Sequence, residues 1–552
     1  MKYSININNS QKHFIQFSIE LDTSGVSFVD LQLPSWRPGR YELGDFAKNI
    51  KGFNVYDKAG NNINFCKISK DLWRVDSQGQ NKVFVKYQYY AAELNAGSTW
   101  LDENQLYINP INCCMYDPLK KDQAYVLELN IPEEYKIATS LKKKDQFLYA
   151  NGFDELVDSP IICSPTLQIF NYSSNEIDFY LCFQGEIKVD WEKVKKDFIQ
   201  FTDYQIKLFD SFPVKEYYFL FQITPYSSYH GVEHQHSTVI LLGPSYSIFN
   251  KNYSKLLGIS SHELYHTWNV KTIRPDDMLP YDYSKENYTQ MGYVTEGVTT
   301  YMGDRLLYES EVFSEHDYLK ELSNLLHRHF HNDGRKHFSV ADSSFDTWLD
   351  GYVQGVPGRK VSIYVEGALI ALICDARIRS STNKKYSLHD VMKSMYSGNN
   401  TLKGYDENSY KHLLEEISGS SFDDIYDDLI HGNVDFISYL DIAFKEFGWI
   451  INKKISTKAT NKYGLQGGWM NNSFKVSLVA EGSAADFSGL ISGDKVHSIN
   501  GYKLNNDLDQ WLDYFNEDVI TLSLEREGEL KRLVLAKQNE VQLYIYSVDK
   551  KI

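Results

Sequence analysis

Apolar and polar positions alternate along residues 1–165, with turn residues between the short apolar runs. Val83, Val85 and Tyr87 show this period of two. Because successive side chains of a β-strand point to opposite faces, the period predicts strands with one buried face. We predict a sandwich-like N-terminal β domain over residues 1–170, in which the many tyrosines pack on half-buried sheet faces.

Helical spacing of apolar residues begins near Trp191 and continues to Phe444, which predicts a mainly helical domain over residues 171–455. After Trp449 short alternating runs and glycine-containing turns return, and they predict a third domain over residues 456–545. A chain of 552 residues is long enough for several domains of ordinary size. The expected fold class is therefore multidomain α+β.

A His-Glu-x-x-His pattern lies in the predicted helical domain, on a segment with apolar helical spacing that ends before Pro275. His262 and His266 are four residues apart, so a helix places both imidazoles on one face, with Glu263 beside them. Two such imidazoles can hold Zn²⁺, which lowers the pKa of a water molecule to about 7, and Glu263 can take its proton. The alternative is an amphipathic helix with two surface histidines, and the pattern alone leaves both open.

A catalytic zinc ion takes a third protein ligand and keeps one position open. Residues 292–301 predict a second helix, and Glu296 lies in it. We expect Glu296 to be the third ligand of one zinc ion. A lone glutamate on a helix is ordinarily solvated, so this expectation depends on the first motif.

Residues 262–275, read as HELYHTWNVKTIRP, resemble an extended signature of the glycyl-aminopeptidase family of PDZ-containing gluzincin metallopeptidases. Three further blocks are similar to segments of that family and lie in the same order: 33–41 with 45–47 near the N-terminus, 295–299 around the third ligand, and 358–369. Ile363 and Glu366 stand where the family has Tyr and Lys, and Glu366 puts in doubt a basic group there. The resemblance implies a thermolysin-like zinc domain followed by a PDZ domain, and removal of small N-terminal residues such as Gly or Ala from peptides.

The resemblance also implies groups that bind and polarise the substrate. In related gluzincin aminopeptidases an edge strand binds the substrate backbone, so Gly231 and Val232 are expected to contact it and Glu233 to bind the free amine. The alternative is that this strand, within residues 231–241, faces solvent. Tyr364 is expected to stabilise the oxyanion, and its alternative is a buried core tyrosine.

The C-terminal region carries two blocks, residues 482–490 and 493–501, that resemble a PDZ domain. Residues 464–467 approximate its carboxylate-binding loop, and residues 504–515 its groove helix. A PDZ domain binds a peptide C-terminus as an added strand, so such a peptide is a possible partner. The alternative is a structural brace for the catalytic domain.

The formal net charge of −16 disfavours nucleic acid and anionic membranes as partners. The N-terminus does not resemble a signal peptide and no segment is apolar over about 18 residues, so we expect a cytoplasmic protein. The sequence thus predicts a zinc aminopeptidase that acts on peptides with a free N-terminus. Two alternatives remain: a zinc endopeptidase whose PDZ domain presents substrates, and a non-catalytic peptide-binding scaffold.

Overall fold

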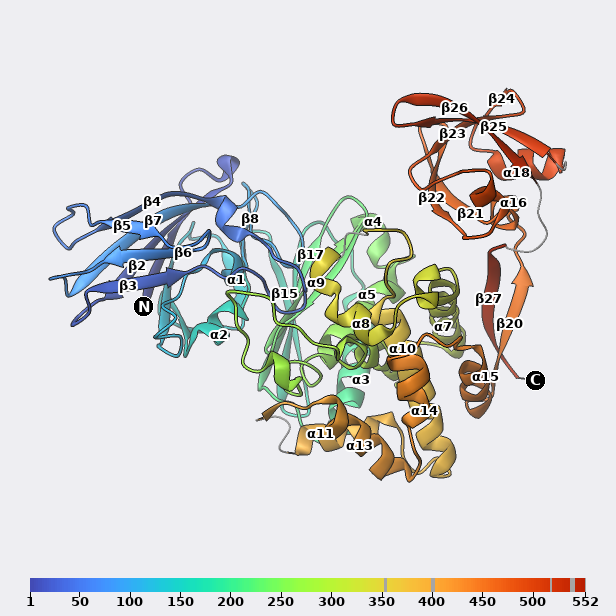
Figure 1. Ribbon diagram of the computed structural model, residues 1–552. Helices are drawn as coiled ribbons and strands as arrows, with labels where there is room; N and C mark the ends of the chain where they lie inside the picture. The colour runs from blue at the N-terminus through green and yellow to red at the C-terminus, as the bar shows by residue number, and fades with distance from the viewer. Residues whose placement is uncertain (352–354, 399–402, 517–518, 537–541, 552) are drawn as a thin grey trace.

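The computed structural model describes the chain except for residues 352–354, 399–402, 517–518, 537–541 and 552. A β-rich N-terminal part, a helical central part and C-terminal β-sheets follow one another along the chain (Figure 1). This arrangement confirms the predicted multidomain α+β class. No helix in the described part of the chain has both the length and the apolar character needed to cross a bilayer.

Three sheets build the N-terminal part. The largest has the order β12 (Lys142–Lys144), β13 (Phe147–Ala150), β10 (Tyr125–Asn130), β1 (Lys2–Asn6), β2 (Phe14–Asp22), β7 (Lys82–Tyr90) and β4 (Ile50–Tyr56). The others are β3 (Phe28–Gln32), β6 (Leu72–Asp76) and β5 (Phe65–Lys67), and β11 (Lys136–Thr139), β14 (Ile161–Ser164), β9 (Leu106–Ile108) and β8 (Trp100–Leu101). Val83, Val85 and Tyr87 of β7 are buried, as their alternation predicts, and side chains of all three sheets share one apolar core.

The central part begins with a five-stranded sheet. Its order is β15 (Gln168–Ser174), β16 (Ile177–Gln184), β17 (Glu216–Ile223), β19 (Ser237–Gly243) and β18 (Ser228–Glu233). The predicted boundary at residue 170 therefore falls inside β15. The expected single strand within residues 231–241 is wrong: the chain turns between β18 and β19, where the amide of His234 donates to the carbonyl of Ser237 at 2.9 Å. Strand β18 lies at the edge of the sheet.

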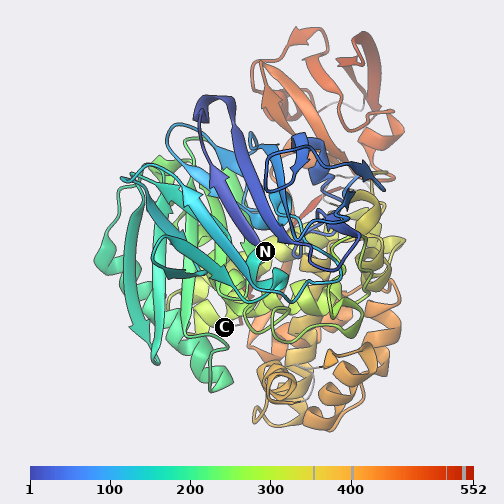
Figure 2. The same ribbon diagram turned by 90° about the vertical axis from the view of Figure 1, so that its left-hand side faces the viewer.

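Helices complete the central part around the apolar core of the molecule. They include α3 (Trp191–Phe209), α5 (Tyr253–Tyr265), α6 (Thr299–Glu309), α7 (Glu315–Phe330), α10 (Ile363–Ser381), α11 (Leu388–Ser397), α13 (Glu407–Ser418) and α15 (Ile437–Glu446). Helix α10 is buried on nearly every side, since its sequence is apolar around most of its circumference. In Figure 2 the strands of the five-stranded sheet and the later helices lie on opposite sides of this part.

A two-stranded ribbon carries the C-terminal β-sheet. It pairs β20 (Trp449–Ile455) with β27 (Tyr544–Lys550), and β27 packs on α7. Between these strands the chain forms β21 (Leu465–Met470), β22 (Ser473–Val479), β23 (Lys495–Ile499), β24 (Tyr502–Lys503), β25 (Val519–Arg526) and β26 (Glu529–Ala536), with helices α16 (Ala459–Lys462), α17 (Ala484–Phe487) and α18 (Leu508–Phe515). We call α16 through β26 the C-terminal unit. Its apolar core is its own, and the predicted boundary at residue 545 falls inside β27.

Candidate metal centre

Helix α5 presents the first two predicted ligands. Its apolar side, including Leu256, Leu257 and Leu264, is buried, so the opposite side with His262 faces the site. His266 follows the last helical residue, and its Nδ1 donates to the carbonyl oxygen of Asn269 at 2.9 Å. This hydrogen bond leaves Nε2 of His266 as the ring's acceptor, 3.1 Å from Nε2 of His262.

Glu296 completes the predicted set. Its Oε2 lies 3.4 Å from Nε2 of His266 and 3.8 Å from Nε2 of His262. Tetrahedral zinc with bonds of about 2.0–2.2 Å separates neighbouring ligand atoms by roughly 3.3 Å, so these spacings suit one ion. The structure thus brings His262, His266 and Glu296 together as a group that can hold a metal. The His262 side chain is 18% exposed whereas the other two are 2% exposed, so the site opens on the His262 side.

Glu296 does not lie on an α-helix. Residues Tyr293–Val298 form a π-helix that continues directly into α6. A π-turn widens the helix, and such turns are frequent at functional sites. The predicted helix over residues 292–301 is therefore correct in extent but not in type, because apolar spacing does not distinguish the two helices over a single turn.

Two glycines allow α10 to approach this π-helix. A Cβ on Gly297 would lie 2.3 Å from Cα of Gly367, and a Cβ on Gly367 would lie 2.7 Å from Cα of Gly297. Neither glycine has a positive φ, so backbone contact rather than conformation requires them. Sequence reasoning assigned no role to either residue. Their contact places Tyr364, one turn before Gly367, beside the metal ligands.

Tyr364 is partly exposed rather than buried in a core. Its ring centroid lies 6.4 Å from that of His262. Burial raises the pKa of Glu296, and the charge of His266 and a hydrogen bond with Tyr364 lower it. The ring of Tyr364 therefore lies beside the metal ligands, next to His262.

Glu263 projects toward the neighbouring edge strand. A Cβ on Gly231 of β18 would lie 2.0 Å from Oε1 of Glu263, so only glycine leaves room for this carboxylate. Oε2 of Glu263 is buried and has no hydrogen-bond partner among the described residues. Burial raises the pKa of Glu263 well above its usual value, and the nearby charges of Glu233 and Glu296 add to this rise.

The charges around the centre fit a cation. Burial lowers the pKa of His262 well below its ordinary value, as a metal-binding imidazole requires. Burial alone would also lower the pKa of His266, but the carboxylates of Glu296, Glu233 and Glu263 raise it to about 10. Three carboxylates around two imidazoles make a negative site that a divalent cation would neutralise.

Glu233 is 5% exposed, so it does not face solvent as the alternative for this strand required. Carboxylate oxygens of Glu233 and Glu263 and a ring nitrogen of His266 lie within 4.8 Å of one another. Val232 points the other way into an apolar cluster, so only its backbone can contact a substrate. A Cβ on Gly39, whose φ is +77°, would lie 2.4 Å from Oε2 of Glu233, so the N-terminal part reaches the centre.

A buried cluster of charged residues near the end of edge strand β18 was not predicted from the sequence. Asp158 accepts from Lys271 Nζ at 2.7 Å and from the amide of Gln235 at 2.8 Å, and lies 3.1 Å from Nδ1 of His234. The cluster joins the N-terminal part to the turn after Glu233 and to the loop after the zinc helix. Lys271 belongs to the block 262–275, but nothing in the sequence indicated its partner.

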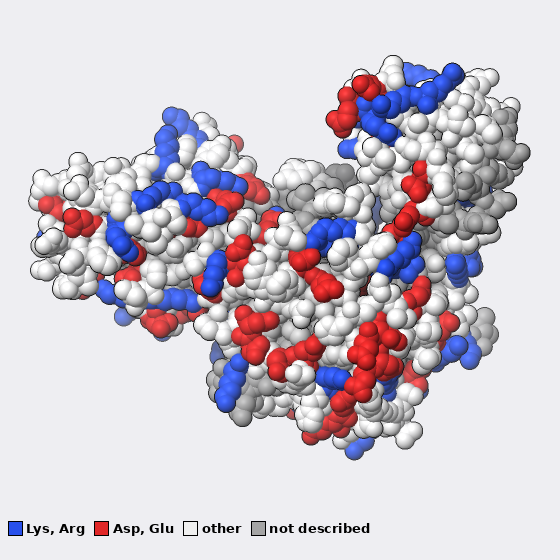
Figure 3. All heavy atoms as spheres, viewed as in Figure 1, with Lys and Arg blue, Asp and Glu red and all other residues white. Residues whose placement is uncertain are grey.

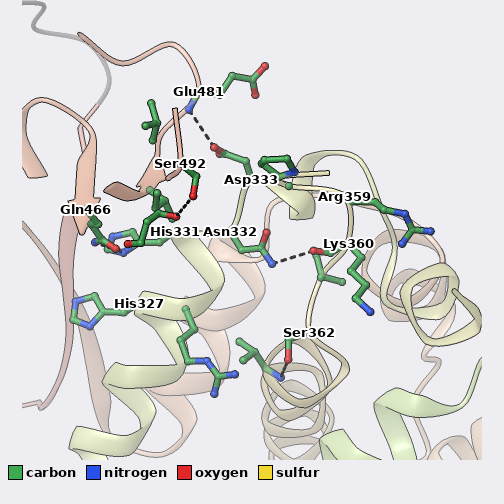
Figure 4. A pocket seen from close by; sticks show the side chains of 18 of the residues that line it. His327, His331, Asn332, Asp333, Arg359, Lys360, Ser362, Gln466, Glu481 and Ser492 are labelled. Atoms are coloured by element: carbon green, nitrogen blue, oxygen red, sulfur yellow. Dashed lines mark hydrogen bonds between the residues drawn. The ribbon is translucent and has the colours of Figure 1, made fainter. Parts of the chain in front are cut away.

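Two cavities border the centre. Glu233 lines one of about 470 Å³ between the N-terminal and central parts. Tyr364 lines another of about 1440 Å³, whose walls come from α7, residues 358–366 and the C-terminal unit (Figure 4). The centre therefore has a small space on the side of Glu233 and a large one on the side of Tyr364.

Comparisons with known proteins agree with this geometry. Residues 2–165 match the model of the Peptidase M61 N-terminal domain, and residues 255–370 match that of M61 glycyl aminopeptidase. The crystal structure of an aminopeptidase N family protein from Idiomarina loihiensis is 28% identical, with a TM-score of 0.92 over 100% of this chain and 98% of that one. A substrate-bound mutant of an M1 zinc metallopeptidase from Deinococcus radiodurans is 10% identical, with a TM-score of 0.46 over 76% of this chain and 90% of that one.

No curated protein shows a significant match to the chain. The two matched models cover both the N-terminal part and the segment that carries the three ligands and Tyr364. The match to the Idiomarina loihiensis structure covers the whole of this chain, so the likeness includes the C-terminal unit. The chain belongs to the M61 glycyl aminopeptidase family of metallopeptidases.

Proposed function

We propose that this protein is a zinc-dependent aminopeptidase that removes one small residue, such as Gly or Ala, from the N-terminus of a peptide. The observation that carries the proposal is the convergence of His262, His266 and Glu296 beside the buried carboxylate of Glu263. Two imidazoles and one carboxylate are the donors of many catalytic zinc sites. The distances between their ligand atoms suit a single ion.

Zinc bound there would polarise the scissile carbonyl and lower the pKa of a water molecule. Glu263 accepts the proton of the attacking water and passes it to the leaving amine. Its raised pKa suits both steps, because the group must hold the proton between them. Tyr364 donates to the carbonyl oxygen as negative charge develops on it.

Glu233 supports removal of a single residue. A buried carboxylate beside the centre attracts a cationic N-terminus, and the edge of β18 offers the backbone of Gly231 and Val232 to the substrate. The contact of Gly39 with Glu233 restricts the space around the anchored amine, which supports a small first residue. Glu233→Ala should abolish the preference for free over N-acetylated peptides, and unchanged discrimination would refute the assignment.

We also propose that the C-terminal unit is a PDZ domain. Edge strand β21, the short helix α17, the helix α18 and the β25–β26 hairpin around Gly528 support this assignment. Residues 464–467 lie at the start of β21, where a carboxylate-binding loop would lead into the strand that a peptide joins. Binding of C-terminal peptides to the full chain tests it, and no binding would leave a structural brace.

Zinc content and hydrolysis of aminoacyl 4-nitroanilides test the proposal as a whole. We expect one zinc ion per chain and activity on glycyl and alanyl anilides. Glu263→Gln should keep the zinc and lose at least about 100-fold in kcat, while Glu416→Gln, an exposed carboxylate on α13, should change neither. Protein that lacks stoichiometric zinc and is no more active than Glu263→Gln would support a non-catalytic scaffold instead, and cleavage of capped peptides an endopeptidase.

A further inference from the structure

The larger cavity extends from Tyr364, whose ring lies beside that of His262, to the C-terminal unit. Tyr364 and Glu366 of α10 line it, as do His327 and Arg328 of α7. In Figure 4 the side chains of Glu481 and Ser492 of the C-terminal unit lie above those of His327 on α7 and of Ser362. At about 1440 Å³ the cavity is three times the size of the one beside Glu233. It can hold several residues of a peptide, whereas the smaller one suits a single residue.

Each acidic side chain that lines this cavity already has a partner. Glu366 lies 2.6 Å from Nδ1 of His329, and Asp333 accepts from Lys336 at 2.7 Å. Glu481 lies 3.7 Å from Lys336, and the amide of Gly482 donates to Asp486 at 2.9 Å. Their negative charges are therefore at least partly compensated within the protein.

Among the Lys and Arg side chains that line the cavity, two have a partner and two form no ion pair with a described residue. Arg359 pairs with Asp346 at 2.7 Å and Lys360 donates to the carbonyl of Gly351 at 2.9 Å. Arg328 and Lys458 make no ion pair with any residue that the structure describes. These are two positive charges of the lining that lack an acidic partner in the described part of the chain. An anion is the complementary ligand.

The position of Arg328 relates it to the reacting groups. Helix α7, which carries Arg328, packs against α10, which carries Tyr364. Arg328 and Tyr364 line the same cavity, so Arg328 lies on the side of the centre where Tyr364 borders that cavity.

We propose that the cavity between the catalytic centre and the C-terminal unit receives the part of a short peptide that follows the scissile bond, and that Arg328 binds the peptide's C-terminal carboxylate. This inference rests on the proposed aminopeptidase function. A guanidinium binds a carboxylate through two parallel hydrogen bonds, which makes it a good anchor for a chain end. The substrate class is then oligopeptides with both ends free, and Lys458 on the far wall adds attraction for the same charge.

Three substrates test the proposal: the peptide Gly-Ala-Ala-Ala, its C-terminal amide, and glycyl 4-nitroanilide. We expect kcat/KM for the free acid to exceed that for the amide by about tenfold, mainly through KM, because a charged hydrogen bond is lost in the amide. The preference should weaken as salt is raised. Equal rates for acid and amide would overturn the proposal without using any variant.

Arg328→Met should lower the acid-to-amide ratio to near one, and Arg328→Lys should retain part of it. Lys458→Met should lower the ratio by less than Arg328→Met. Arg532→Met removes the same charge from the exposed face of β26, outside the cavity, and should keep the wild-type ratio. A preference that survives Arg328→Met would overturn the role of Arg328. Failure to cleave even the anilide would refute the aminopeptidase itself, so the two failures are distinguishable.

Discussion

The N-terminal part and the C-terminal unit both border the catalytic centre, but they are joined to it in different ways. On the N-terminal side, Trp36 is fully buried, donates to the carbonyl of Asp282 at 2.7 Å and packs on Tyr281 and Trp348. Met278, Tyr281 and Tyr283 of the central part belong to the N-terminal apolar core. On the C-terminal side the unit has its own core and is connected through the β20–β27 ribbon, and the exposed side chains of Glu481 and Lys336 lie 3.7 Å apart. Figure 3 shows acidic and basic side chains on the surface where this unit meets the central part.

This difference assigns different roles to the two neighbours. Buried charges and shared apolar contacts fix the position of a neighbour, whereas exposed ion pairs contribute little. The N-terminal part therefore acts as a fixed component of the centre, since Gly39 lies against Glu233. The C-terminal unit instead contributes part of the wall of the larger cavity and has an apolar core of its own. Five predictions test this contrast, from the largest expected effect to the smallest.

Asp158→Asn should weaken the attachment of the N-terminal part to the central part. Lys271 is 4% exposed, so the substitution leaves a buried ammonium without its carboxylate, which costs about 3–5 kcal/mol in similar pairs. We expect a lower thermal midpoint and reduced activity, because Gln235 and His234, which follow Glu233, lose their charged acceptor as well. Differential scanning calorimetry measures the first effect, and an unchanged midpoint would contradict the assigned role.

The same carboxylate predicts a pH dependence. Burial alone would raise the pKa of Asp158, but Lys271 and His234 lower it well below its ordinary value. A carboxyl group whose pKa is lower in the folded than in the unfolded state stabilises the protein at pH values above its unfolded pKa of about 4. This stabilisation is lost progressively as the pH falls below that value. Wild-type stability should therefore fall more steeply than that of Asp158→Asn below about pH 4. If the stability of the two proteins fell equally steeply below about pH 4, the proposed contribution of Asp158 would be refuted.

Tyr364→Phe tests the opposite side of the centre. Loss of one oxyanion donor costs about 10²–10³ in comparable enzymes, so we expect kcat to fall between about tenfold and a thousandfold. Zinc should remain bound, because His262, His266 and Glu296 are untouched. Steady-state kinetics with zinc analysis checks both, and a fully active variant would remove the phenol from the mechanism.

Whether a contact of the fold or of the site could be predicted from the sequence depends on how far apart its residues are along the chain. The pair His262 and His266 was predictable because four residues of helix bring them together, and resemblance supplied Glu296. The contact of Gly297 with Gly367 and the cluster of Asp158 with Lys271 were not, because each joins segments that are distant in sequence. A single sequence carries no record of which distant residues meet.

Gly231→Ala, with Gly468→Ala as its control, compares strand β18 beside the centre with strand β21 of the C-terminal unit. The added Cβ would meet Oε1 of Glu263 at 2.0 Å, and a flexible carboxylate can move away at little cost in stability. Displacement of a catalytic group by about 1 Å can cost roughly 100-fold in rate, so we expect a loss of that order in kcat with an almost unchanged thermal midpoint. Gly468→Ala on β21 is the control, since its Cβ would meet nothing within 4 Å.

The smallest effect is expected at the rim of the C-terminal unit. Glu481 and Lys336 are 64% and 42% exposed and 3.7 Å apart, so Glu481→Gln should change the thermal midpoint by no more than an exposed ion pair is worth, below about 1 kcal/mol. The amide of residue 481 still donates to Asp333 in this variant, which leaves the backbone contact intact. A loss comparable to that of Asp158→Asn would mean that the C-terminal unit is fixed as firmly as the N-terminal part. In that case the large cavity would be a rigid pocket of set length, and cleavage rates should fall sharply beyond one peptide length.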